Sequence, residues 1–184
     1  MKTIKLFLAS AVFVCLSSCK DDPKTEKPAE EATIENKVDE NLFRVTLNAT
    51  VLKDDSFQLY YREAESGNFE EANSLFVELK GSEQPQDIVF ILPADAIPYY
   101  IRLDFGTNKE QQPIKVNDFK IEAYGRKFEA KGSEFFSYLL INESTMKKDV
   151  ATSTVTPILT KEGTYDPITT SEKALFDQVQ KLVQ

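Results

Sequence analysis

The sequence predicts an all-β protein with a C-terminal helix, folded as an antiparallel β-sandwich. Apolar and polar residues alternate with a period of two in several short stretches between residues 43 and 141, as in strands with one buried face. Turn-forming residues separate these stretches at roughly 8–12-residue intervals, the spacing typical of sandwiches. Apolar residues recur at helical spacing only near the C-terminal end, from residue 169 onward.

Residues 1–18 have the composition of a secretory signal peptide. Lys2 and Lys5 precede an apolar run at residues 6–16, which is shorter than the about 20 residues that span a bilayer. Small residues then lead to a cysteine in Leu16-Ser17-Ser18-Cys19. This motif resembles the lipobox of bacterial lipoproteins, in which the cysteine is acylated and becomes the mature N-terminus.

The lipobox resemblance implies a location. Lipid on Cys19 would anchor the chain to a membrane, since several acyl chains together give stable binding. Lys20, Asp21 and Asp22 resemble the export signal that sends Bacteroidota lipoproteins to the outside of the outer membrane. We therefore expect an outer-membrane lipoprotein that faces the cell surface. The alternative is an ordinary secreted protein that is cut elsewhere, with Cys19 incidental.

Residues 19–41 predict a disordered acidic tether. The stretch contains no aromatic residue and is dominated by charge, alanine and prolines such as Pro23 and Pro28, so it cannot bury enough apolar surface to offset its ordering entropy. The alternative is a short helix that begins with Ile34 and Val38, which lie four residues apart.

Composition excludes several functions. Loss of residues 1–18 would remove two lysines and no acid, which leaves 20 basic and 30 acidic side chains and a formal charge of −10. Such a surface does not favour nucleic acid or anionic lipid as partners. The chain has no histidine, and its two cysteines, Cys15 and Cys19, are consumed by processing and lipidation. We therefore expect no enzyme activity, no metal and no cofactor.

The sandwich domain is predicted to span residues 42–142. A nearly continuous apolar run at residues 88–92, stopped by Pro93, predicts a strand that is buried on both faces. Asn117-Asp118 interrupts an alternation and predicts a β-bulge. The expected strands cover residues 43–51, 57–61, 75–79, 88–92, 99–105, 114–124, 127–131 and 135–141.

The last 42 residues divide into two parts. Residues 143–168 are polar and rich in threonine, which predicts an extended connector with one strand near residues 155–159. Residues 169–184 predict an amphipathic helix, with Thr169 and Glu172 as a capping box. We expect this helix to cover one end of the sandwich; the alternative is a helix that binds a partner. Its apolar positions are Leu175, Val179, Leu182 and Val183.

Carboxylates are the only acid–base material in the chain. Asp54-Asp55 and Glu70-Glu71 are sequence neighbours in turns, whereas glycoside hydrolysis needs two carboxyl groups on opposite sides of a bond. We therefore interpret these pairs as solvated loop charges. Only two carboxylates that converge in the fold would restore a hydrolase hypothesis.

Two aromatic doublets supply the best candidate binding surface. Because adjacent strand residues face opposite sides, inward packing of Tyr61 and Tyr99 would point Tyr60 and Tyr100 outward. Planar polar groups beside an exposed ring are suited to sugars. The alternative is that the connector or the helix covers this face, and that Arg102 and Asp104 are a structural ion pair. The candidate ligand-binding residues are Tyr60, Arg62, Tyr100, Arg102 and Asp104, with Gln58 beside them.

A likeness to a known module appears over residues 43–123. It rests on the stretches at residues 57–61 (FQLYY), 68–74 (NFEEANS), 88–93 (IVFILP), 101–106 (IRLDFG) and 114–121 (IKVNDFKI), in this order. They resemble the β-sandwich module of bacterial cell-surface glycosyltransferases and polysaccharide-related membrane proteins, although Phe105 stands where that module has proline. The module is similar to galactose-binding-like, jelly-roll-type folds.

These observations together predict a lipid-anchored, non-catalytic, carbohydrate-associated binding module. The alternative is a structural or interaction subunit of an outer-membrane complex that has no glycan ligand and docks through residues 143–184.

Overall fold

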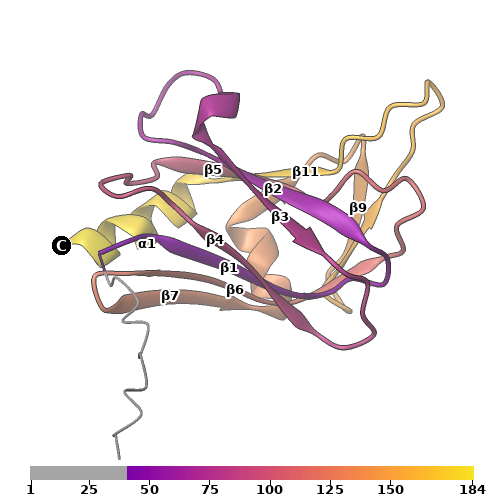
Figure 1. Cartoon of the computed structure of the whole chain (residues 1–184), viewed down its shortest axis with the longest axis horizontal. Helices are drawn as coiled ribbons and strands as arrows, with labels where there is room; N and C mark the ends of the chain where they lie inside the picture. Colours follow the sequence, from indigo (N-terminus) through magenta and orange to yellow (C-terminus); the bar gives the residue numbers. More distant parts are fainter. Residues whose placement is uncertain (1–40) are drawn as a thin grey trace, which may run out of the picture. The chain divides into compact units, whose positions relative to one another are not determined.

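Two antiparallel sheets packed face to face form the fold of residues 41–184, the part of the chain that the computed structural model describes (Figure 1). These residues belong to one compact unit. The predicted β-sandwich with a C-terminal helix is confirmed. The predicted signal peptide, the lipidation site Cys19, the export residues Lys20, Asp21 and Asp22, and all but the last residue of the tether lie outside the described residues.

Within residues 41–184, six strands form the first sheet, in the order β4-β1-β6-β10-β9 with β7 also paired to β6. They are β1 (Arg44–Thr50), β4 (Gln86–Ile91), β6 (Ile114–Ala123), β7 (Arg126–Lys131), β9 (Met146–Asp149) and β10 (Thr154–Pro157). Five strands of the same part of the chain form the second sheet, in the order β3-β2-β5-β11-β8. They are β2 (Asp55–Arg62), β3 (Ser74–Leu79), β5 (Tyr100–Asp104), β8 (Leu139–Ile141) and β11 (Ile168–Ser171).

Three short helical elements of the described residues join or close the sheets. The 3₁₀ helix η1 (Glu71–Asn73) precedes β3, and a second 3₁₀ helix, η2 (Gly132–Ser137), precedes β8. The helix α1 (Lys173–Val183) follows β11 and contacts β6 and β7 of the first sheet and β5 and β11 of the second. It therefore covers one end of the sandwich, as expected (Figure 1).

The core lies between the sheets and consists of the inward side chains that the alternation predicts. Leu47 and Ala49 of β1, Phe57 and Leu59 of β2 and Leu103 of β5 are fully buried. The predicted bulge is also confirmed: the partner of residue 48 is residue 118, and that of residue 49 is residue 116, so residue 117 has no partner on β1.

Strand β4 differs from its prediction. Ile88 and Phe90 are buried, but Val89 is half-buried and Ile91 is 44% exposed, so the strand buries one face rather than two. The reason is that the sandwich has two layers, so the outward side chains of a strand have no second layer over them, and β4 lies at the edge of its sheet besides.

The aromatic segment at residues 135–141 is not one strand. It begins as η2, which turns Phe135 and Phe136 into the core, and only Leu139–Ile141 form a strand. Gly132 adopts a φ of +53°, and the Glu134 carboxylate accepts a 3.0 Å hydrogen bond from the Lys131 backbone N–H. Together these features start the turn at a place where alternation alone suggests a strand.

Residues 143–168, expected as a connector with one strand, contribute β9, β10 and the start of β11. Strand β10 pairs with β6 in the first sheet, and β11 lies between β5 and β8 in the second. The sandwich therefore continues beyond residue 142 and uses C-terminal strands in both sheets. Few apolar residues mark these strands, because each is short and buries one or two side chains, such as Met146 and Val155.

The helix begins later than the predicted capping box requires. Glu172 is the N-cap, and no side chain caps the helix there. Thr169 lies inside β11, fully buried, and its hydroxyl donates a 3.3 Å hydrogen bond to the Leu103 carbonyl. The prediction that Thr169 caps the helix is therefore wrong, because this residue pairs within the second sheet and its hydroxyl is already hydrogen-bonded there. The predicted apolar positions Leu175, Val179 and Leu182 are buried.

Candidate functional site

The outer face of the second sheet brings all the candidate ligand-binding residues together. Antiparallel pairing of β2 with β5 sets three pairs side by side. They are Gln58 with Asp104, Tyr60 with Arg102, and Arg62 with Tyr100. The outward positions follow from the alternation, since the intervening Leu59, Ile101 and Leu103 are buried in the core.

Arg102 and Asp104 form the polar centre of this face. The Arg102 guanidinium donates to both carboxylate oxygens of Asp104, from Nε at 2.8 Å and from Nη2 at 2.6 Å. It also lies 4.6 Å from the centre of the Tyr60 ring, a cation–π contact. Burial raises the pKa of Asp104 despite the adjacent guanidinium. Burial also opposes the charge of Arg102, but the hydrogen bond to Asp104 and the charges of Asp104 and Asp166 together raise the pKa of Arg102.

Tyr60 points outward but is covered. Its side chain is 6% exposed, beneath the loop that joins β2 to β3. The Tyr60 hydroxyl donates a short hydrogen bond to Glu71, and the Phe69 ring meets its ring edge-on at 6.5 Å. Burial, followed by the hydrogen bond to Glu71, raises the pKa of Tyr60 to about 12. The cover is neither the connector nor the helix that the sequence suggested; it is the loop at residues 63–73.

Arg62 holds the covering loop in place. Its guanidinium lies between two rings, 4.8 Å from the centre of Tyr100 and 5.4 Å from that of Phe69. The same group donates a short hydrogen bond to the Gly67 carbonyl. Arg62, packed on Tyr100, thus holds the loop that covers part of this face.

The stack of rings continues from Tyr100 into the helix. Tyr100 contacts Tyr99 at 5.0 Å, and Tyr99 stacks on Phe176 of α1 at 3.9 Å, with an angle of 20° between the rings. Tyr99 was expected to pack into the core, but it is half-buried at this end of the sandwich. The helix is thereby fixed to the same row of side chains that supports the outer face.

The exposed ring on this face is Phe76, which the candidate set did not include. It lies opposite Gln58 on β3 and is 61% exposed, the highest value among the large hydrophobic residues exposed in residues 41–184. The signal was present in the sequence: if Leu75, Val77 and Leu79 alternate inward, Phe76 must point outward.

A depression of about 430 Å³ lies at one end of the face. Its wall includes Ser56 and Glu78, which are paired on β2 and β3 one step beyond Gln58 and Phe76. The opposite wall is the loop after β5, with Thr107 and Asn108. Hydroxyl, amide and carboxylate groups therefore surround a space that adjoins the exposed ring.

Asp55 fixes the loop wall of this depression. Its buried carboxylate accepts hydrogen bonds from the backbone N–H of Thr107 at 2.7 Å and of Asn108 at 3.1 Å, and from the Gln111 amide at 2.8 Å. Gly106 has a φ of +91°, and a Cβ there would collide with the Asp55 carboxylate. Asp55 is thus a structural anchor, whereas its neighbour Asp54 forms an exposed 2.6 Å ion pair with Lys80.

Two carboxylates do converge, on the outer face of the first sheet. Asp118 and Glu129 lie on β6 and β7, and burial together with the Glu129 charge raises the pKa of Asp118. Lys120, Lys127 and Lys131 surround them with N–O distances of 3.5–3.9 Å. The pair lies in a network of ion pairs on a sheet surface. The two carboxyl groups are close enough to hydrogen bond, whereas glycoside hydrolysis needs about 5 Å or more between them to hold the sugar.

Comparison with known proteins gives no match: neither a protein family nor any curated protein or solved structure resembles this chain significantly. Among residues 41–184, no group of three or more acidic or cysteine side chains could hold a metal ion. In the same residues, no helix is long and apolar enough to cross a bilayer.

Proposed function

We propose that the outer face of the second sheet is a non-catalytic carbohydrate-binding surface, carried by a lipoprotein anchored through Cys19 in the outer membrane and facing the cell surface. The observation that carries the proposal is the exposed Phe76 ring, which lies beside a row of planar polar groups and an open polar depression. Small-ligand sites combine apolar surface with a few fixed polar groups in this way.

The arrangement suits a sugar ring. The apolar face of a pyranose would stack on Phe76, and its hydroxyls would reach the Gln58 amide and the Glu78 carboxylate on either side. Gln58 is already oriented, since its Nε2 donates to Glu71 at 3.2 Å and to the Ser74 hydroxyl at 3.0 Å. The next sugar would enter the depression lined by Asn108. The likeness of residues 43–123 to a polysaccharide-related module agrees with this ligand class.

Calorimetry tests the surface directly. The chain from residue 19 to 184, with Cys19→Ser to avoid lipid, is titrated with bacterial and host oligosaccharides chosen from a glycan array. Phe76→Ala should abolish the binding heat and leave the free energy of unfolding within about 0.5 kcal/mol, since the ring is largely exposed. Leu140→Ala is the matched control, because Leu140 is 48% exposed on β8 of the same sheet. Failure of every glycan to bind would reject the proposal.

The lipid anchor has its own test. Cells that express the chain are fed labelled palmitate, and the purified protein is checked for the label. Cys19→Ser should remove the label and release the protein from the membrane fraction. Protease treatment of intact cells then reports whether the folded part faces the medium.

A structural or interaction subunit without a glycan ligand is the second candidate. Val150 and Leu159, 53% and 51% exposed, are the apolar groups that favour it in the C-terminal region. Deletion of residues 143–184 cannot test this idea, because these residues supply strands to both sheets. Val150→Glu and Leu159→Glu should keep the fold, because both side chains are about half exposed. Loss of a co-purified outer-membrane protein in these variants would support the second candidate.

A further inference from the structure

Strand β3 forms an open edge of the second sheet. Within residues 41–184 it pairs with β2 alone. Proteins commonly protect such edges with lysine, proline or very short strands. Strand β9 carries Lys147 and Lys148, and β8 has three residues, whereas β3 has six residues (SLFVEL) with Glu78 as its one charged side chain. Nothing in its own sequence therefore prevents β3 from accepting a further strand.

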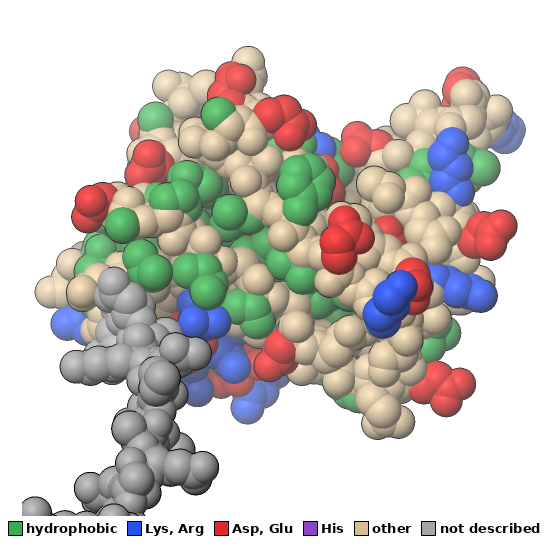
Figure 2. Space-filling view, viewed as in Figure 1, with side chains coloured by type: hydrophobic (Ala, Val, Ile, Leu, Met, Phe, Trp, Pro, Cys, Tyr) green, Lys and Arg blue, Asp and Glu red, His purple; other side chains and the backbone are tan. Residues whose placement is uncertain are grey.

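The inward side chains of β3 are also incompletely covered. Leu75 and Val77 face the core but remain half-buried, while Ile88 and Phe90 of β4, the neighbouring edge strand of the first sheet, are 1% exposed. Figure 2 shows hydrophobic side chains gathered over the region where β3 and β4 lie in Figure 1. A strand added beside β3 would cover its inward residues as β2 covers them from the other side.

We propose that β3 pairs with the β3 of a second copy of this chain, antiparallel across a twofold axis, so that the two second sheets become one continuous sheet. Addition of a strand to an open edge is a common mode of association, and a twofold axis makes the two contacts identical. The inference does not depend on carbohydrate binding.

Side-chain alternation restricts the register. Opposite residues of an antiparallel pair point to the same face, so one residue of each copy lies on the axis. The two registers that pair most of Ser74–Leu79 place either Phe76 or Val77 there. The first register joins two exposed rings and sets Glu78 opposite Ser74. The second sets each Glu78 carboxylate opposite an exposed Phe76 ring. Aromatic cross-strand pairs are stabilising, which selects the register with Phe76 on the axis.

The charges of β3 fit its own copy in this register. No like charges lie opposite each other along Ser74–Leu79, and the inward pairs are Leu75 with Val77. Lys80 follows the strand, pairs with Asp54 of its own chain at 2.6 Å and keeps a side chain that is 89% exposed. It comes opposite the residue after Glu71, in the acidic turn before the second copy's strand. Both ends of the pair therefore bring a cation near carboxylates.

Sedimentation equilibrium of the chain from residue 19 to 184 with Cys19→Ser tests the dimer without lipid or glycan. We expect a dimer whose fraction rises with protein concentration. Phe76→Lys places two like charges on the axis and should give a monomer, with an unchanged circular dichroism spectrum because the side chain is exposed. Leu140→Lys, an equally drastic change at the opposite edge of the sheet, should leave the dimer intact.

Disulfide cross-linking tests the register. Residues 41–184 contain no cysteine. The Cα atoms of directly opposite residues in an antiparallel pair lie about 4.5–5.5 Å apart, within the Cα–Cα range that a disulfide bridges. Phe76→Cys should therefore cross-link two copies under oxidised glutathione, as should a mixture of Ser74→Cys with Glu78→Cys, while Glu78→Cys alone should not.

Three outcomes would overturn the proposal. One is a monomer at every concentration at which the protein is soluble. That result would leave β3 unpaired, or paired with another part of the chain or with another protein. Another is a dimer that survives Phe76→Lys. The third is cross-linking of Leu140→Cys as efficient as that of Phe76→Cys.

Discussion

The two outer faces of the sandwich satisfy their charged side chains in different ways. On the first sheet, acids and lysines lie opposite each other across β6 and β7, as in the pairs Asp118 with Lys131 and Lys120 with Glu129. The ion pairs on this face join residues of the same strand, Lys120 with Asp118 and Glu129 with both Lys127 and Lys131. Their N–O distances are long, at 3.5–3.9 Å, and the lysine side chains remain partly or largely exposed. Water can replace such contacts with little loss of folding free energy, so this face is a network of solvated ion pairs.

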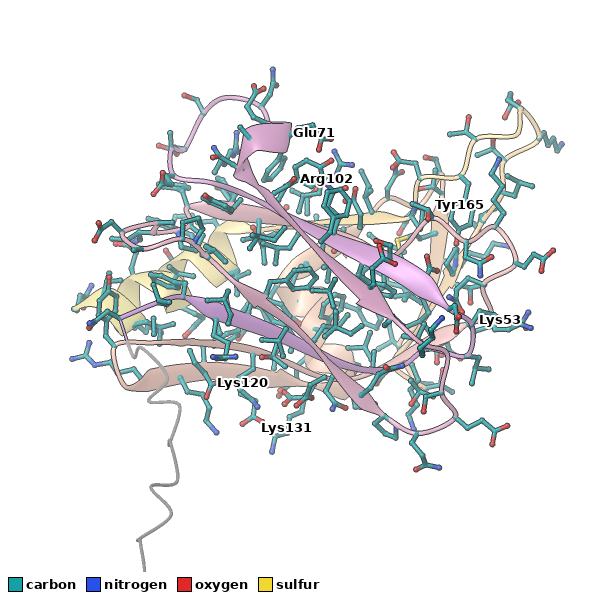
Figure 3. All side chains as sticks on the ribbon, in the orientation of Figure 1. Lys53, Glu71, Arg102, Lys120, Lys131 and Tyr165 are labelled. Carbon is teal, nitrogen blue, oxygen red and sulfur yellow. The ribbon has the colours of Figure 1, made fainter. Side chains whose placement is uncertain are left out.

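On the second sheet, charges are held by rings and by a loop. Arg102 binds Asp104 through two hydrogen bonds and lies against the Tyr60 ring, and Glu71 covers Tyr60 from above. Figure 3 shows Glu71 and Arg102 on one side of the sandwich and Lys120 and Lys131 on the other. Contacts of this kind need closely fitting side chains. Substitutions on the second sheet should therefore lower the free energy of unfolding more than equivalent ones on the first.

The largest expected effect is that of Tyr60→Ala. Removal of this buried ring takes contacts from Phe69, Arg102 and Glu71, and we expect the free energy of unfolding to fall by about 3 kcal/mol. Lys120→Ala, on the other face, should change it by less than about 0.5 kcal/mol. Urea titration of both variants measures the contrast, and equal losses would erase the distinction between the faces.

Arg102→Met should have the next largest effect. The variant leaves the half-buried Asp104 carboxylate without its guanidinium partner, and we expect a loss of about 1–2 kcal/mol after allowance for the 16% exposure of Asp104. The double variant with Asp104→Leu should recover much of this loss, since no charge is then left unpaired. A double variant less stable than Arg102→Met would show that the unpaired Asp104 carboxylate is not the source of the loss.

Tyr60→Phe should change how the free energy of unfolding depends on pH. The pKa of Tyr60 is about 12 in the folded chain and about 10 in an unfolded one, so the folded state holds the proton more tightly. The resulting stability is complete below pH 10 and is lost as pH rises from about 10 to about 12. Tyr60→Phe should flatten this alkaline decline and cost about 1 kcal/mol at neutral pH. Tyr165, whose pKa burial raises to about 12, titrates in both proteins and serves as the internal reference.

The smallest effect is expected for Glu129→Gln on the first face. Loss of the Glu129 charge should lower the pKa of Asp118, which burial and that charge now raise, and carbon-detected NMR of the carboxyl groups can follow it. The free energy of unfolding should change by less than about 0.5 kcal/mol, because the surrounding lysines exchange partners. A loss of stability as large as that of Arg102→Met would mean that the ion pairs of the first sheet contribute substantially to the stability of the fold.

Sequence reasoning placed the second face correctly because alternation is a local property. Once Leu59 and Leu103 are assigned to the core, Tyr60, Arg102 and Asp104 must share the other side of their strands. The same pattern does not predict that the loop at residues 63–73 folds over Tyr60, because the sequence of a polar loop does not indicate the direction in which it folds. Sequence reasoning overlooked Phe76, although the same alternation exposes that ring.

The amino-acid pattern alone predicts the class of fold, the inward and outward residues of the long strands, the bulge at residue 117 and the apolar stripe of the helix. Each of these follows from the period of apolar residues, which depends on neighbours along the chain. Other features became visible only in the folded chain: β4 buries one face, Thr169 joins a sheet instead of capping a helix, and Tyr60 is covered while Phe76 is exposed. These outcomes depend on partners distant in sequence, because burial and strand pairing are set by which surfaces meet.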